Sequence, residues 1–196
     1  MFEQTLVILK PDVVARGIIG EILVRFERVG LKVVAMKMLQ VPHELAKEHY
    51  KKDDEWLLKV GTKLIKNQGL DPNTEDPMKH GQRICDSLAE DLMEYPVVAM
   101  VLEGHNSIAL VRKMIGEQSP ENSAPGTIRG DYSQDTYVLA NASDRPVINL
   151  VHASDEPENA KNEIALWFKP EEIIKWEKPD AKIHFRGIEK ANKAKQ

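Results

Sequence analysis

The chain alternates between two kinds of hydrophobic pattern, and each predicts one kind of element. Short, nearly continuous apolar runs rich in β-branched residues predict buried strands. Such runs occupy residues 5–9, 97–102 and 147–151. The first has no room for a polar face, so we expect a central strand that is covered on both sides. Alternation of apolar and polar residues predicts a further strand over 31–40, before Pro42 interrupts it.

Apolar residues that recur at helical spacing predict the helices. The predicted helical ranges are 18–29, 44–50, 56–68, 84–92, 107–115 and 157–168. Glycines follow three of them and provide the stop that a left-handed position favours. We expect Asn106 to cap the helix that begins after it, and Ser154 and Asp155 to cap the last one.

This succession of elements contains two β-α-β halves. It predicts an α+β fold, a ferredoxin-like βαββαβ antiparallel sheet with helices packed on it, across one face. A length of 196 residues suits one domain with a sizeable core. We therefore interpret residues 1–196 as a single domain.

Composition narrows the classes of function. The chain has 42% hydrophobic and 30% charged residues, as expected of a soluble domain. No apolar stretch approaches the roughly 20 residues of a membrane helix, and the N-terminus lacks a signal-peptide pattern, so we expect a cytoplasmic protein without a membrane partner. The single Cys85 excludes an internal disulfide, and no Cys/His cluster has zinc-ligand spacing. A net charge of -4 gives no general attraction to nucleic acid, so we expect no specific nucleic-acid partner.

One histidine is placed where chemistry is expected. His152 comes directly after the apolar run 147–151, just past the end of the predicted strand, and before the last helix. A lone histidine there is commonly a satisfied polar residue at a strand edge. Glu163 on the following helix favours another interpretation, because its carboxylate can accept a hydrogen bond from one ring nitrogen and leave the other free to attack. His152 is therefore a candidate nucleophile.

Three cationic residues accompany it. Lys10 follows the first buried strand, where it either reaches a pocket as a point charge for phosphate or extends along the surface. Arg129 lies among turn formers at 123–131, and loops of this kind carry function on a rigid scaffold. Spacing alone makes Arg112 a solvated residue of its helix.

Several segments resemble those of nucleoside diphosphate kinases. The active-site segment of that family is similar to Asn149-Leu-Val-His152-Ala-Ser154-Asp155 and to Glu163-Ile-Ala-Leu-Trp167-Phe168. Further similar segments are Leu9–Asp12 with Arg16-Gly17 and Gly20-Glu21-Ile22, Glu48–Tyr50, Pro96–Gly104, Val111–Gly116, Ser123–Asp131 and Lys169–Ile173. The resemblance covers residues 3–50 and 95–176, apart from an insertion in the second range.

The resemblance implies an enzyme that moves the γ-phosphate of a nucleoside triphosphate, typically ATP, to nucleoside diphosphates. It also implies a ping-pong mechanism through a phosphohistidine at His152. It further implies that Mg²⁺ is carried by the nucleotide phosphates, without a metal ligand from the protein, and that the chain forms a homo-oligomer (hexamer, tetramer or dimer). The chemistry of the candidate histidine and of the three cationic residues agrees with this activity. Phosphoryl transfer requires an in-line nucleophile and cations around the negative charge that is spread over the phosphate oxygens.

The resemblance also assigns roles to single residues. The lysine and the two arginines contact the phosphates, the asparagine holds the sugar or the leaving oxygen, and a serine and a glutamate orient the histidine beside a tyrosine. The residues assigned to catalysis are His152, Glu163, Ser154, Lys10 and Tyr50, and those assigned to the nucleotide are Lys10, Arg112, Arg129 and Asn149.

The chain departs from the family pattern at four places. A helical insertion occupies about 51–95 and a loop insertion about 132–146. The loop insertion covers the site mouth or a subunit contact, or is a tolerated surface loop. The tail at about 180–196 diverges, and its lysine-rich run from 182 to 195 is a solvated tail or a weak contact with nucleic acid or a subunit. Gln118 replaces the usual threonine and is a weaker candidate for the phosphate contact.

The family's base-clasping aromatic residues are missing from the first insertion. Trp56, Leu58 and Ile84 are the alternatives for stacking on the base, and Leu58 is included among the predicted nucleotide-binding residues. Two other functions compete with the kinase. A catalytically silent nucleotide-binding or RNA-binding module would not need His152, and an RNA-binding sheet would expose stacked aromatics in its central strands. A hydrolase using His152 as a general base would release inorganic phosphate instead of storing it.

Overall fold

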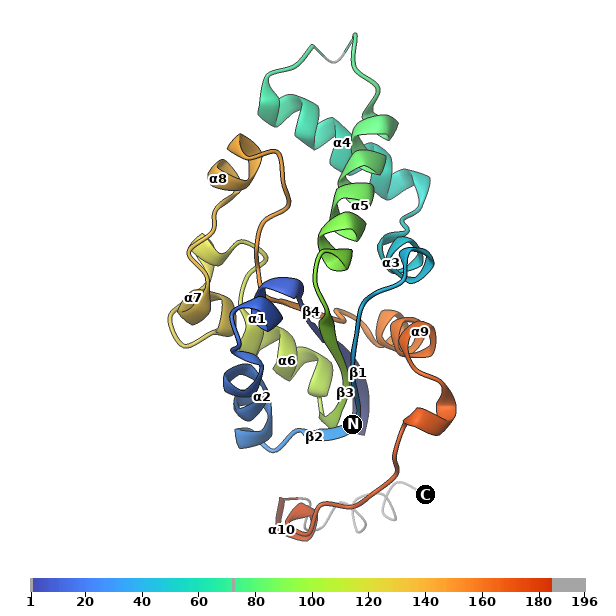
Figure 1. Ribbon diagram of the computed structural model, residues 1–196, viewed down its shortest axis with the longest axis vertical. Helices are drawn as coiled ribbons and strands as arrows, with labels where there is room; N and C mark the ends of the chain where they lie inside the picture. The colour runs from blue at the N-terminus through green and yellow to red at the C-terminus, as the bar shows by residue number, and fades with distance from the viewer. Residues whose placement is uncertain (1, 72, 185–196) are drawn as a thin grey trace, which may run out of the picture.

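A four-stranded antiparallel sheet forms the centre of the molecule, in the order β2-β3-β1-β4. The computed structural model describes residues 2–71 and 73–184 (Figure 1). The strands are β1 (Phe2–Leu9), β2 (Lys32–Leu39), β3 (Val97–His105) and β4 (Val151–Ala153). β1 pairs with β3 over its full length and with β4 at its far end. This strand order confirms the predicted α+β fold of the βαββαβ type.

Helices connect and cover the strands. They are α1 (Pro11–Ala15), α2 (Ile19–Arg28), α3 (His43–Tyr50), α4 (Asp54–Gln68), α5 (Pro77–Met93), α6 (Ser107–Ile115), α7 (Ile128–Tyr132), α8 (Tyr137–Ala142), α9 (Pro157–Trp167) and α10 (Ala181–His184), with 3-10 turns at Pro120–Asn122 and Pro170–Glu172. The six helices predicted from apolar spacing are all present. Four short helices, α1, α7, α8 and α10, were not predicted, because four to six residues show no clear helical period. The second insertion is therefore not only a loop, since it contains α8.

Both faces of the sheet are covered, so the expectation of helices across one face alone was wrong. Side chains alternate along a strand. In β1, Val7 and Leu9 pack with residues of α2 and α6, whereas Leu6 and Ile8 pack on the opposite side with residues of α3, α5 and α9. The expectation that β1 is a central strand covered on both sides is confirmed. These opposite faces explain why its sequence is apolar at consecutive positions.

The first insertion forms a helical hairpin that projects from the sheet (Figure 1). Its helices α4 and α5 cross where each has a glycine. A Cβ atom added at Gly61 would meet the backbone carbonyl of Pro77, and one added at Gly81 would meet that of Leu57. The hairpin therefore depends on two positions without side chains.

We expect Gly81→Ala to lower the free energy of unfolding by about 1 to 3 kcal/mol, because the helices must separate to admit the methyl group. Chemical denaturation measures this change. Gly20→Ala is the matched control, since no atom lies within 4 Å of its added Cβ. Alanine there should stabilise α2 by about 0.4 to 1 kcal/mol. Equal effects of the two substitutions would contradict the close approach of α4 and α5.

The strand before His152 is shorter than predicted and begins later. The expected range was 147–151, but β4 spans Val151–Ala153, so His152 lies within the strand, opposite Ile8, and not past its end. Leu150 has φ of 68°, in the left-handed region, which ends the extended conformation. Just before it, the N–H of Ile148 donates to the Asp135 carboxylate at 2.7 Å instead of joining the sheet.

The predicted capping side chains do not cap. Asn106 occupies the position before α6, but its side chain makes no capping hydrogen bond and its φ is 49°. The carboxylate of Glu3 accepts a hydrogen bond from the N–H of Ile108 instead, at 3.1 Å. The residue before α9 is Glu156, not Ser154 or Asp155. A distant side chain can thus replace a local cap, which sequence spacing does not reveal.

The described residues end soon after the predicted tail begins. They include α10 but not residues 185–196, so most of the lysine-rich run at 182–195 lies outside the described part of the chain. Within residues 2–71 and 73–184, no helix is long and apolar enough to cross a membrane.

Candidate functional site

His152 is held at the sheet edge by α9. Its Nε2 lies 3.0 Å from Oε1 of Glu163, and the other carboxylate oxygen accepts a hydrogen bond from Ser154 Oγ at 2.6 Å. Ser154 Oγ in turn accepts from the N–H of Leu6 at 3.2 Å. Because a carboxylate only accepts, Nε2 of His152 carries the proton and Nδ1 of the neutral ring keeps its lone pair. With 23% of the His152 side chain exposed, a substrate can reach this nitrogen.

The carboxylate of Glu163 stays ionised in this position. Burial alone would raise its pKa, but the hydrogen bonds from His152 and Ser154 outweigh burial and leave the pKa below its usual value. An ionised Glu163 can stabilise positive charge that develops on His152 when Nδ1 attacks.

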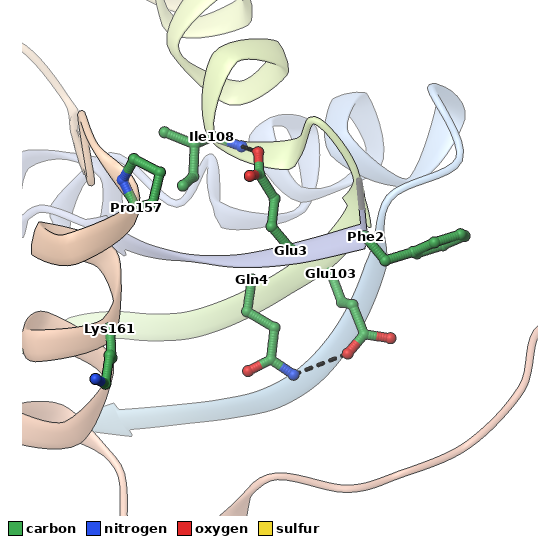
Figure 2. A pocket seen from close by; sticks show the side chains of 7 residues that line it. All are labelled: Phe2, Glu3, Gln4, Glu103, Ile108, Pro157 and Lys161. Atoms are coloured by element: carbon green, nitrogen blue, oxygen red, sulfur yellow. Dashed lines mark hydrogen bonds between the residues drawn. The ribbon is translucent and has the colours of Figure 1, made fainter. Parts of the chain in front are cut away.

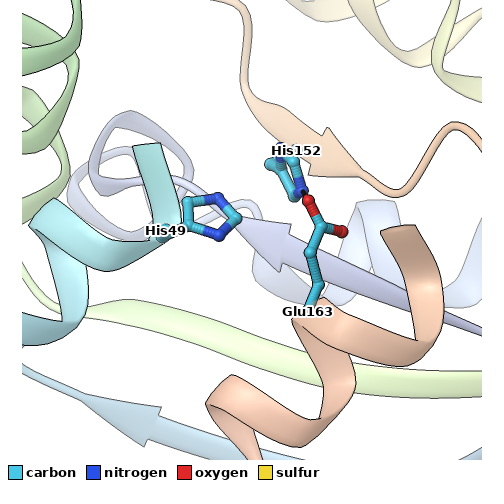
Figure 3. A group of neighbouring side chains, drawn as sticks. All are labelled: His49, His152 and Glu163. Carbon is cyan, nitrogen blue, oxygen red and sulfur yellow. Dashed lines mark hydrogen bonds and ion pairs between the residues drawn. The ribbon is translucent and has the colours of Figure 1, made fainter. Parts of the chain in front are cut away.

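Two aromatic residues of α3 lie next to the nucleophile. The His49 and His152 rings meet edge to face, with centroids 4.4 Å apart (Figure 3). Tyr50, predicted to border His152, lies edge to face with His49, with the ring centroids 4.8 Å apart. Burial, and then the carboxylates of Asp91 and Glu163, raise the pKa of Tyr50, so its hydroxyl stays protonated at neutral pH.

The same group contains potential metal ligands. Ligand atoms of His49, His152 and Glu163 lie within 4.8 Å of one another, and no other such group occurs among the described residues. However, Trp167 Nε1 donates to Nδ1 of His49 at 3.2 Å, so the proton of neutral His49 is on Nε2. Both Nε2 atoms are thus protonated and Nδ1 of His49 is used by Trp167, so Nδ1 of His152 is the one nitrogen of this group with a free lone pair. The arrangement suits an oriented nucleophile better than a metal centre.

A buried polar network begins at the end of β1. Lys10 is 6% exposed, and its Nζ donates to Oδ1 of Asn149 at 2.8 Å. The amide nitrogen of Asn149 donates to the backbone carbonyl of Gln118 at 2.9 Å. The structure thus brings these three predicted residues together, but Gln118 takes part through its backbone, while its side chain is exposed.

Two carboxylates compensate for the buried lysine. Burial lowers the pKa of Lys10, and the charges of Asp91 and Asp12 oppose that effect. Burial raises the pKa of both carboxyl groups, and Lys10 lowers it. Oδ2 of Asp12 is buried and has no hydrogen-bond partner within the described part of the chain. The three residues border a cavity of about 180 Å³, so the lysine faces an open space.

Arg129 is bonded to the backbone rather than pointing freely into a pocket. It is 4% exposed and donates to four backbone carbonyls, those of Gly116, Glu117, Asn149 and Val151, at 2.7 to 3.2 Å. A guanidinium has five N–H groups, so one remains for a phosphate oxygen. Burial, and then the nearby Arg112, lower the pKa of Arg129 to about 10, which keeps it charged at neutral pH.

The other predicted residues lie at the margin of this network. Arg112 donates to the carbonyl of Ala153 at 3.5 Å, which places it beside β4. Leu58 is 50% exposed on α4, which belongs to the helical hairpin and packs on α5. The Nζ of Lys52 lies 5.9 Å from the centroid of the Trp56 ring, and Ile84 is half-buried on α5.

A larger cavity of about 380 Å³ lies at the other end of β1 (Figure 2). It is lined by residues of β1, β3, α6 and α9, including Glu3, Gln4 and Lys161. Among these residues, Gln4 donates to Glu103, its partner on the neighbouring strand, at 2.8 Å. None of the predicted site residues lines this cavity, so size alone does not identify the active site.

Sequence reasoning missed His49, Asp12 and Asp91. His49 adjoins Tyr50, and its place on the buried side of an amphipathic helix was a usable signal. Asp12 lies two residues after Lys10 in the sequence, and this proximity was also a usable signal. Asp91 is distant in sequence from every motif, and its approach to Lys10 follows only from the fold.

The geometry of the site agrees with comparisons to known proteins. A family model described as nucleoside diphosphate kinase matches residues 3–58 and 76–173. This chain belongs to the nucleoside diphosphate kinase family. It is therefore a phosphotransferase that binds nucleotides, as the sequence motifs predicted. Residues 59–75, the distal part of α4 and the loop after it, are not matched.

Relatives and solved structures cover nearly the whole chain. A nucleoside diphosphate kinase from Pyrobaculum aerophilum is 48% identical over 179 residues, which cover 88% of this chain and 98% of the relative. A crystal structure of an NDP kinase from that organism has a TM-score of 0.84 at 44% identity and covers 89% of this chain and 100% of its own. A structure of the Borrelia burgdorferi enzyme, described as a transition-state mimic with bound vanadate and ADP, has a TM-score of 0.78 at 38% identity. The match covers 94% of this chain and 97% of that one.

Proposed function

We propose that this family member transfers the γ-phosphate of a nucleoside triphosphate, typically ATP, first to Nδ1 of His152 and then to a nucleoside diphosphate. The observation that carries the proposal is the bond between Nε2 of His152 and Glu163, which leaves Nδ1 as the free nucleophile. Ser154 supports the proposal because it fixes the carboxylate in turn. A silent binding module would need none of these contacts.

The cations near His152 suit the phosphates. We infer that Lys10, Arg112 and the remaining N–H of Arg129 bind phosphate oxygens, and that Asn149 positions the sugar or the leaving oxygen. Lys10 and Asn149 already hold each other at 2.8 Å, so a bound nucleotide would meet an ordered pair. Preorganised charges of this kind stabilise the transition state without reorganisation.

Mg²⁺ fits this site as a companion of the nucleotide. The one group of potential ligands in the described residues contains two imidazoles, whereas Mg²⁺ prefers oxygen. The unpartnered Oδ2 of Asp12 is an oxygen acceptor beside Lys10 and could receive a hydrogen bond from a metal-bound water. Mg²⁺ supplies charge that neutralises the phosphates. The protein residues bind the remaining phosphate oxygens and orient the nucleophile.

Intact-mass analysis after mixing with Mg²⁺ and ATP tests the proposal. We expect the chain to gain one phosphoryl group, which acid removes, alkali preserves and added nucleoside diphosphate discharges, because the bond is a phosphoramidate. His152→Asn should take up no label, and His80→Asn, whose histidine pairs with Glu75 in the hairpin, should be labelled normally. Active native protein without a label, or steady release of inorganic phosphate, would show that the proposal is wrong.

We expect purine and pyrimidine diphosphates to be accepted with kcat/KM values within about two orders of magnitude of one another. The candidates for the base contact, Trp56, Leu58 and Ile84, offer apolar surface, and stacking contributes about 1 to 3 kcal/mol without reading base edges. A steady-state survey of ADP, GDP, CDP and UDP measures the spread. A preference beyond about 10⁴-fold would mean that polar groups read the base edge.

Assembly and location are further parts of the proposal. Met36 and Met38 are more than half exposed on the edge strand β2, and exposed apolar groups at a sheet edge favour association. We therefore keep the prediction of a homo-oligomer, a dimer, tetramer or hexamer, which light scattering would measure. A cytoplasmic location is proposed from the composition and the single cysteine.

A further inference from the structure

Two residues of helix α9 act on the ring of His152, one by a direct contact and one through His49. Glu163 accepts a hydrogen bond directly from Nε2 of His152. Trp167 lies four residues further along the same face of the helix and acts on a different ring. Its Nε1–H donates to Nδ1 of His49 at 3.2 Å, and the Trp167 and His49 rings meet edge to face with centroids 5.5 Å apart. His49 in turn touches His152.

The hydrogen bond from Trp167 fixes the proton of His49. An indole N–H can only donate, so Nδ1 of His49 keeps a lone pair and Nε2 carries the proton. Burial, and then the proximity of His152, lower the pKa of His49 well below its usual value, so the ring stays neutral. Nε2 of His49 is nevertheless buried without a hydrogen-bond partner among the described residues. A buried donor without an acceptor is costly, so its retention requires a reason.

The ring of His152 is the nearest group that explains it. Figure 3 shows the end of the His49 ring that carries both nitrogens turned toward the face of His152. The planes are 81° apart and the centroids 4.4 Å apart. A partly positive N–H and C–H edge on a π face is attractive. Glu163 therefore restrains His152 at the ring edge, and His49 restrains it at the ring face.

We propose that His49 is a positioning residue for phosphoryl transfer, which Trp167 orients and which holds the His152 ring so that Nδ1 keeps one direction. This inference rests on the proposed phosphorylation of His152. The effect is expected on the rate of attack rather than on nucleotide affinity, because the ring contacts and the hydrogen bond of His49 join it to His152, Tyr50 and Trp167, and none of these is assigned to the phosphates. A misplacement of about 1 Å in a nucleophile can slow attack by about 10²-fold.

Three variants separate positioning from folding. His49→Phe keeps an aromatic edge but removes the N–H and the acceptor for Trp167. Trp167→Phe removes the donor and frees His49 to change its proton position. The double variant leaves neither polar partner unpaired, so its free energy of unfolding should recover relative to the single variants. Each protein is mixed with Mg²⁺ and ATP in a single turnover, and the phosphorylation rate, the ATP affinity and the free energy of unfolding are measured.

We expect phosphorylation to be about 10-fold slower in His49→Phe and in the double variant, with the ATP affinity unchanged within about twofold. Trp167→Phe should be slower by about threefold, and the two effects should not be additive because both act through one ring. If the rate recovers in the double variant together with stability, His49 is only a structural residue and the proposal is overturned. Rates equal to that of the native chain in all three variants overturn it as well.

His80→Phe and Trp176→Phe are the matched controls. His80 pairs with Glu75, and Trp176 donates to the carbonyl of Val33, both away from His152. Their phosphorylation rates should equal that of the native chain. Native chain that takes up no phosphoryl group would contradict the proposed function itself, whereas a labelled native chain with unaffected His49 variants would contradict the positioning role alone.

Discussion

Replacing Arg129 by alanine is expected to lower the free energy of unfolding by about 3 to 5 kcal/mol, in addition to slowing the reaction. The guanidinium donates to four backbone carbonyls that come from the segment after α6 and from the segment that leads into β4. Removing it leaves several of these acceptors without their donor, and hydrogen bonds from a charged group contribute about 1.5 to 3 kcal/mol each before relaxation. Chemical denaturation of the variant measures the loss.

The controls for this prediction are two other changes. Arg129→Lys should recover only part of the stability, because an ammonium group cannot match a planar fork of donors. Arg16→Ala should change stability by less than about 0.5 kcal/mol, since Arg16 is exposed and donates to a single backbone carbonyl, that of Tyr132. If Arg129→Ala were as stable as Arg16→Ala but inactive, the arginine would act on phosphate alone and not on the fold of the site.

Arg129, which the sequence indicated only as a phosphate ligand, is therefore expected to stabilise the fold of the site as well. The family motif around Arg129 indicated function, but its structural partners at 116, 117, 149 and 151 are brought to it by tertiary packing. Spacing along the chain carries no signal for such bonds. The same holds for Lys10, whose burial follows from the position of the strand end, while its partner Asn149 is distant in sequence.

The sheet was predictable because its signals are local. The runs at 5–9 and 97–102 are apolar at consecutive positions, and both became strands buried on two faces. The run at 147–151 is equally apolar and β-branched, yet only its last residue is in a strand. Leu150 takes a left-handed conformation there, and Asp135 binds the backbone of Ile148. Tertiary contacts override propensity at this point, next to the catalytic histidine.

The catalytic pair was predictable for a related reason. His152 and Glu163 belong to consecutive elements, so a strand followed by a helix that packs back on the sheet brings them together. His49 comes from another part of the chain and approaches through α3, which no local pattern could position against β4. The sequence thus predicted the contact of the Glu163 carboxylate with the His152 ring edge, but not the contact of His49 with the ring face.

Lys10→Met is expected to lower kcat/KM by roughly 10- to 150-fold, and by similar factors for every nucleoside diphosphate. The substitution keeps most of the aliphatic stem and removes the charge that faces the cavity beside Asp12 and Asp91. One charged hydrogen bond to a phosphate contributes about 1.5 to 3 kcal/mol, which corresponds to that range. Arg112→Ala should cause a loss of the same order, because Arg112 lies beside β4 and is assigned to the same phosphates.

Lys113→Ala is the matched control, because Lys113 is exposed on the same helix as Arg112 but points in a different direction around its axis. Its kcat/KM should stay within about twofold of the native value. Steady-state rates with ADP, GDP, CDP and UDP as acceptors decide the assignment, since the phosphates are common to all four substrates. A loss at Lys10 that differs strongly between bases would mean that the lysine contacts the base, and a loss at Lys113 as large as that at Arg112 would mean that only the overall charge of α6 matters.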